Sequence, residues 1–156
     1  MSFIWGEINW VQNSFESYNV LKEDILRYPY DDKHEVKRKN AQLGLLDVAL
    51  RKSPFHQNKI IEDHELGISL VGDIRLDYRA DLLNKLRLNS EKKHFLSDTE
   101  FVYEAYKKWG VECTNYLEGD WAFVIVFWEK NEVFLARDPM GLRPLFFYKT
   151  NKFIVF

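Results

Sequence analysis

The stretch that most constrains the fold of this chain is WAFVIVFW, at residues 121–128. All eight residues are apolar, and a strand without a polar face needs apolar cover on both sides. The run is much shorter than the roughly 20 apolar residues that a membrane-spanning helix requires. It therefore predicts a central strand in a layered domain, with other elements packed on each of its faces.

Further strand and turn signals surround this run. The opening residues form a largely apolar strand pattern, and residues 29–40 are expected to form an exposed loop. Turns are predicted at 131–132 and 150–151. The remaining predicted strands are 41–51, 66–75, 120–129, 132–138, 144–149 and 152–156. We predict that 41–51, 66–75 and the C-terminal strands supply two facing sheets.

Three segments have helical patterns. Residues 17–28 place apolar side chains at helical spacing. In the third segment, 97–110, Ser97 or Asp98 can cap the helix and Gly110 can end it. Asp77 is expected to cap the second helix, whose predicted apolar face is Tyr78, Leu82, Leu83 and Leu86. Strands, a helical middle and a final antiparallel meander predict an α+β domain.

Composition excludes several classes of function. The 156 residues fit one domain, and the net charge of −2 gives no basic field for nucleic acid. The four histidines lack metal-ligand spacing, so no metal site is expected. A single cysteine, Cys113, excludes an intramolecular disulfide and is predicted to be a small core thiol. Without a signal peptide or membrane segment, we expect a cytoplasmic protein.

The first two residues raise the possibility of catalysis. Removal of Met1 would leave Ser2 with a hydroxyl and a free α-amine, which is the nucleophile-and-base pair of an N-terminal nucleophile hydrolase. Serine after methionine is also simply common. The pair alone therefore does not decide between a catalytic and an ordinary residue.

Two later motifs indicate a family. SDTE at 97–100 and LEGDWAFVIVFWEKNEVFLARDPMGLRPLFFY at 117–148 resemble the glutamine amidotransferase domain of asparagine synthetases. MSFIWGEIN resembles that family's opening with its cysteine replaced, and VGDIRLDYRADL (71–82) lies where the family has an NGEIYN-type loop. The resemblance covers nearly the whole chain. It implies the four-layer αββα sandwich of N-terminal nucleophile hydrolases.

The resemblance also implies four site elements, and three of them are altered. Ser2 occupies the position of the cysteine nucleophile, and Gln42 is the best match for the arginine that grips the glutamine carboxylate. The Asn-Gly pair of the oxyanion hole corresponds to Gly72-Asp73. Only Asp98, which holds the α-amine of glutamine in the family, is kept, and it could equally be a helix cap. Because losing one such donor or clamp costs a hundredfold or more, the site is expected to be inactive.

The turn ARDPMG (136–141) has a structural explanation beside the family one. Gly141 is expected to adopt a positive φ, and Arg137 is expected to brace the turn by pairing with Asp138.

Three functional hypotheses follow. The preferred one is a glutaminase-inactive, structural domain of an ATP-dependent, asparagine-synthetase-like, amide-forming enzyme, as in proteins similar to β-lactam synthetases and lasso-peptide cyclases. ATP and Mg are implied only for a synthetase domain in cis or in trans, and no cofactor is expected in this domain. One alternative is an amidase or acylase that uses Ser2 as nucleophile. The other is a non-catalytic module that binds a small ligand or a protein through the old glutamine pocket near Asp98 and Asp73, where two carboxylates would favour a cationic or amine ligand.

The end of the chain suggests how such a domain would associate. KFIVF (152–156) stops inside an apolar strand, which we interpret as a piece of a longer protein. An exposed apolar surface would then dock on the synthetase partner, and a homodimer is possible. The residues expected at the edges of this surface are Met140, Leu142, Arg143, Phe153 and Phe156.

Overall fold

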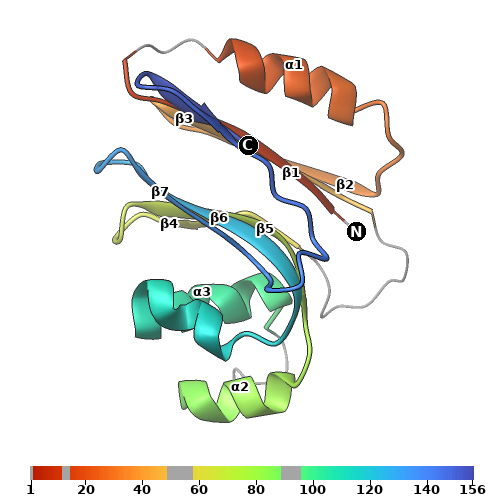
Figure 1. Cartoon of the computed structure of the whole chain (residues 1–156), viewed down its shortest axis with the longest axis vertical. Helices are drawn as coiled ribbons and strands as arrows, with labels where there is room; N and C mark the ends of the chain where they lie inside the picture. Colours follow the sequence, from red (N-terminus) through yellow and green to blue (C-terminus); the bar gives the residue numbers. More distant parts are fainter. Residues whose placement is uncertain (1, 12–14, 49–57, 89–95) are drawn as a thin grey trace.

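The computed structural model describes residues 2–11, 15–48, 58–88 and 96–156. Within these ranges two antiparallel sheets lie face to face (Figure 1). Helix α1 (Glu16–Ile25) covers the outer face of one sheet, while α2 (Arg79–Leu86) and α3 (Asp98–Trp109) cover the outer face of the other. These layers form the predicted αββα sandwich.

The two sheets differ in how their strands are assembled. The first has the order β2 (Asp32–Lys37), β3 (Ala41–Asp47), β1 (Ser2–Asn9), β9 (Phe153–Val155) and β8 (Tyr148–Lys149). The second has the order β4 (Ile61–Asp63), β5 (Ile68–Leu76), β6 (Gly119–Phe127) and β7 (Glu132–Arg137). A 3₁₀ helix, η2 (Gly110–Tyr116), follows α3. The N-terminal strand β1 is therefore central in the first sheet, and β9, near the C-terminus, lies next to it.

The apolar run at 121–128 does occupy a central strand with cover on both faces. On β6, Trp121, Phe123 and Ile125 pack with the helices α2 and α3. Val124 and Val126 face the other way and pack between the two sheets. Both faces of β6 are therefore buried, as the absence of a polar face predicts.

A third apolar cluster fixes α1 on the first sheet. Phe15 and Tyr18, at the start of this helix, are buried together with Trp5 and Leu46 of the sheet. Gly44 on β3 lies opposite Trp5 on β1, and a Cβ at Gly44 would come within 2.1 Å of the Trp5 ring. The indole therefore occupies the space that a side chain at position 44 would need.

Two of the expected local structures are wrong. Residues 29–40 include the strand β2, whose exposed residues alternate with half-buried ones because it is a charged edge strand. Asp77 does not cap α2. Tyr78 stands at that position with a φ of +50°, 69% exposed, while Asp77 forms an ion pair with Arg75.

Other boundaries shift by several residues. Helix α1 ends at Ile25 rather than at 28, and only Tyr148–Lys149 of the predicted 144–149 strand pair in a sheet. Strand β3 ends at Asp47, and the predicted residues 49–51 lie outside the described part. The Ser97 cap of α3 is confirmed, because Ser97 and Glu100 form a capping box.

Cys113 is buried in the core beside α3, as predicted. Burial raises the pKa of the Cys113 thiol to about 11. Among the described residues, no helix is long and apolar enough to cross a membrane.

Replacing Gly44 with alanine tests the packing of Trp5. Gly44→Ala should lower the free energy of unfolding by about 1–3 kcal/mol, the usual cost of overpacking a core. Urea unfolding followed by circular dichroism measures this. In a Trp5→Leu background the same substitution should cost much less, because the indole is gone. Equal costs in both backgrounds would contradict the proposed contact.

Candidate functional site

Ser2 begins β1 and is buried, with 6% of its surface exposed. Its backbone N–H donates to Asp73 Oδ1 at 3.1 Å, which connects β1 in one sheet to β5 in the other. Its hydroxyl donates to Asp47 Oδ1 at 2.6 Å, because Asp47 lies directly opposite Ser2 in the β1–β3 register. Both polar groups of Ser2 are therefore bound to carboxylates.

Asn58 completes the surroundings of the Ser2 hydroxyl. Its Nδ2 donates to Ser2 Oγ at 2.9 Å, and its Oδ1 accepts from the Ile74 N–H at 3.1 Å. The Thr99 hydroxyl lies 3.4 Å from the same Oδ1. Asn58 is thus a buried bridge from Ser2 to β5 and to the first turn of α3.

Asp73 lies between the chain's N-terminal strand and an arginine. Its Oδ2 forms an ion pair with Arg143 Nη1 at 3.1 Å, and both side chains are largely buried. Burial raises the pKa of the Asp73 carboxyl, while the charge of Arg143 acts to lower it. The net effect is a pKa above the ordinary value.

The turn at 138–143 holds Arg143 in place. The Asp138 carboxylate accepts the backbone N–H groups of Leu142 and Arg143, each at 3.1 Å. The predicted pairing of Arg137 with Asp138 is therefore wrong, because these backbone donors occupy the carboxylate instead. Gly141 has a φ of +67°, as predicted.

The structure brings together only part of the predicted site. Ser2 and Asp73 are in contact, and Gly72 lies beside them in β5, where a Cβ would be 2.9 Å from the Ala122 carbonyl oxygen. Gln42 opposes Glu7 in the β1–β3 register, five residues along β3 from Asp47. At about 3.4 Å per residue, this places Gln42 about 17 Å from the end of the strand that contacts Ser2.

Asp98 has a different environment from Ser2. It is fully buried at the start of α3, and its carboxylate forms an ion pair with Arg79 of α2. The hydroxyl of its neighbour Thr99 contacts Asn58, so the start of α3 adjoins the hydrogen bonds around Ser2. Its structural role is to join the two helices.

Sequence reasoning missed Asp47, Asn58 and Arg143. The β1–β3 register is the signal that would have identified Asp47, because antiparallel pairing places it opposite Ser2. On β3, the residue opposite Ser2 is therefore an aspartate.

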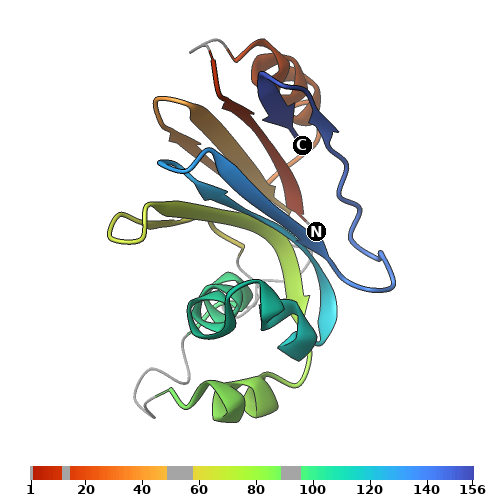
Figure 2. The ribbon, with the colours of Figure 1, turned by 60° about the vertical axis from the view of Figure 1, so that its left-hand side comes forward.

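A cavity of about 410 Å³ opens beside Ser2. Ser2, Asp73 and Arg143 form its polar end, and the rest of its wall is apolar. The segment 138–147, which links β7 to β8, runs along the side of the sandwich from one sheet to the other and closes part of this wall (Figure 2).

This fold is that of amidotransferases of the N-terminal nucleophile hydrolase type. The chain superposes on the glutamine phosphoribosylpyrophosphate amidotransferase of Bacillus subtilis, solved with ADP and GMP, with a TM-score of 0.67. The match covers 99% of this chain and 41% of that one, at 18% identity. This likeness concerns the fold.

Sequence comparison defines the family. Residues 44–156 match the model of the glutamine amidotransferase domain, and the chain belongs to this family. It is 28% identical over 158 residues to a Methanocaldococcus jannaschii protein named as a glutamine-hydrolysing asparagine synthetase. It is 27% identical over 150 residues to asparagine synthetase 2 of Bacillus subtilis. These matches include 95% and 90% of this chain, respectively. They span only 30% and 19% of the lengths of the two relatives.

Replacing Asp138 with asparagine tests the turn that holds Arg143. Burial acts to raise the pKa of Asp138, but hydrogen bonds from the backbone N–H groups of Arg143 and Leu142 hold it below its ordinary value of 3.8. The carboxylate therefore stabilises the fold above pH 3.8, and this contribution is lost as the pH falls through the lowered pKa.

Asp138→Asn should consequently lower the free energy of unfolding at pH 7 by about 1–3 kcal/mol. The difference from the unchanged chain should shrink as the pH falls below 4. Urea unfolding at a series of pH values measures it, and a difference that stays constant down to pH 3 would contradict this role.

Proposed function

We propose that this chain is a glutaminase-inactive, structural domain of an ATP-dependent, asparagine-synthetase-like, amide-forming enzyme. The observation that carries the proposal is the position of Ser2 between two carboxylates, Asp47 and Asp73. Membership of the amidotransferase family supplies the context.

Electrostatics around Ser2 oppose nucleophilic attack. Attack on an amide builds negative charge on the substrate oxygen, which active enzymes stabilise with donors. Here the hydroxyl lies 2.6 Å from the Asp47 carboxylate, and Asp73 is bound to the same residue. Arg143 balances only one of these two acids. Developing negative charge beside Ser2 would therefore meet the Asp47 carboxylate, which Arg143 does not balance.

The same geometry hinders the α-amine of Ser2 from acting as the base. In this mechanism the free α-amine must be neutral to accept a proton. The Ser2 nitrogen lies 3.1 Å from Asp73, and a carboxylate at that distance favours the protonated amine. This weighs against the alternative in which Ser2 serves an amidase or acylase.

The alternative of an amine ligand beside Asp98 and Asp73 also loses support. Each of these carboxylates has an arginine of the chain as a partner, Arg79 for Asp98 and Arg143 for Asp73. Neither acid offers an uncompensated charge to a cationic ligand.

The partner we propose is an ATP-dependent synthetase domain, in cis or in trans. The relatives are named as glutamine-hydrolysing asparagine synthetases, and this chain matches less than a third of their length. ATP and Mg would belong to that other domain.

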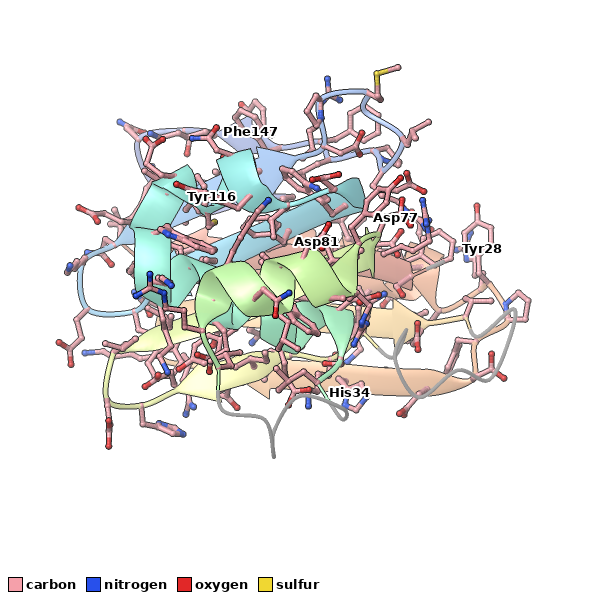
Figure 3. All side chains as sticks on the ribbon, turned by 90° about the horizontal axis from the view of Figure 1, so that it is seen from below. Tyr28, His34, Asp77, Asp81, Tyr116 and Phe147 are labelled. Carbon is pink, nitrogen blue, oxygen red and sulfur yellow. The ribbon has the colours of Figure 1, made fainter. Side chains whose placement is uncertain are left out.

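An exposed apolar surface fits such a partner. The docking surface consists of Met140, Leu142, Phe146, Phe147 and Tyr148, which are 60–81% exposed. Phe147 lies at the periphery of the molecule in Figure 3. Two of the expected edge residues do not belong to this surface, because Arg143 is largely buried and Phe156 is 8% exposed. Phe153 is half-buried.

The assay of ammonia release from L-glutamine tests the inactivity. With Met1 removed, the chain should show no measurable turnover, while an active glutamine-hydrolysing relative serves as the positive control. Ser2→Cys should not restore activity, because Asp47 and Asp73 remain. A rate approaching about 1 per second, ordinary for an enzyme, would refute the proposal.

Sedimentation at rising protein concentration tests the docking surface. The isolated chain should self-associate, because an apolar patch of this kind is buried when a partner is available. The double variant Phe146→Ser, Phe147→Ser should shift the equilibrium toward monomer. Leu66→Ser is the matched control, since Leu66 is 53% exposed on another hairpin. A strictly monomeric chain, or equal effects of both variants, would contradict this role.

A further inference from the structure

The cavity beside Ser2 shares Ser2 and Asp73 with the site that the family resemblance implies, but not its other residues. It lies between α1, the start of β1 and the segment 138–147, and its lining includes neither Asp98 nor Gln42. Its volume of about 410 Å³ falls in the range of small-molecule sites. Its apolar wall includes Phe3, Trp5, Leu21, Ile25, Phe146 and Phe156. An aromatic or aliphatic group is the kind of ligand that such a wall favours.

At the polar end of the cavity, Arg143 has N–H groups without an acceptor in the described part of the chain, but both oxygens of Asp73 already have partners. Asp73 is occupied on both oxygens, Oδ1 by the Ser2 N–H and Oδ2 by Arg143. Arg143 offers five N–H groups, and its only side-chain partner among the described residues is Asp73. Its Nε is buried and has no acceptor there. The Nη groups, unlike the buried Nε, therefore retain donors for an acceptor in the cavity.

Charge then selects the kind of acceptor. Asp47 and Asp73 already face one arginine, so a carboxylate ligand would add a third negative group. An ammonium would find the Asp73 oxygens engaged. A neutral carbonyl meets neither obstacle, because it accepts a hydrogen bond without bringing charge into a partly buried site.

We propose that this cavity binds a neutral acyl amide with an aromatic or aliphatic side chain, its carbonyl oxygen accepting from Arg143. The aromatic or aliphatic side chain of this ligand packs against the apolar wall of the cavity. Acyl amides are the product class of an amide-forming enzyme. The inference rests on the proposed function only for this link between the ligand and the enzyme's product.

The test uses N-acetyl-L-phenylalaninamide as the probe and the whole 156-residue chain. Isothermal titration calorimetry should give one site with a dissociation constant of about 1 mM or below, as expected for a ligand of this size. N-acetyl-L-phenylalanine, L-phenylalaninamide and L-glutamine should bind at least tenfold more weakly. Absence of saturable binding of the probe, or tighter binding of any of the three charged compounds, would overturn the proposal.

Two variants and one control locate the binding. Leu21→Trp fills the cavity from α1 and should abolish binding, whereas Leu66→Trp, on a remote hairpin, should leave it unchanged. Arg143→Met should weaken binding about tenfold, because it removes the donor. Circular dichroism verifies that each variant is folded. Unchanged affinity in Leu21→Trp would exclude this cavity, and unchanged affinity in folded Arg143→Met would exclude the carbonyl contact.

Ammonia release from the same probe separates the two proposals. Hydrolysis would contradict the inactive Ser2 while leaving the binding site intact. Binding without hydrolysis supports both.

Discussion

Much of this structure depends on one buried carboxylate. Asp73, on β5, accepts the backbone N–H of Ser2 from the facing sheet and pairs with Arg143 from the segment 138–147. It thereby joins the two sheets and the linking segment at a single point. A buried charge of this kind is costly unless its partners stay in place, so all three elements are held together. Part of the cavity wall and most of the docking surface lie on the segment that Asp73 anchors.

The same interaction underlies our proposal that this amidotransferase fold is inactive as a glutaminase. An active site needs donors aimed at developing negative charge and a neutral amine as base. In this chain the corresponding space holds Asp47 and Asp73, and Asn58 donates to the Ser2 hydroxyl. These groups satisfy one another, as buried polar groups generally must. We infer that the residues now stabilise the sandwich, while its exposed apolar segment supplies an interaction surface.

Local signals allowed much of the fold to be predicted from the sequence. The apolar run at 121–128 required cover on both faces, Ser97 with Glu100 formed a capping box, and Gly141 required a positive φ. The strand β2 was missed because its charged residues suit an exposed edge as well as a loop. The partners of Ser2 could not be predicted in the same way. Asp47 depends on the register of β1 and β3, and Arg143 lies 141 positions along the chain, so both contacts require the tertiary structure.

A double-mutant cycle between Asp73 and Arg143 tests the central claim most directly. The variants are Asp73→Asn, Arg143→Met and the two combined, with the free energy of unfolding measured in urea at pH 7. If the buried pair anchors the segment 138–147, the coupling energy should be about 1–3 kcal/mol, because each single change leaves its partner unpaired. Effects that add within about 0.5 kcal/mol, the range for independent sites, would show that the two residues do not support one another and would contradict the account.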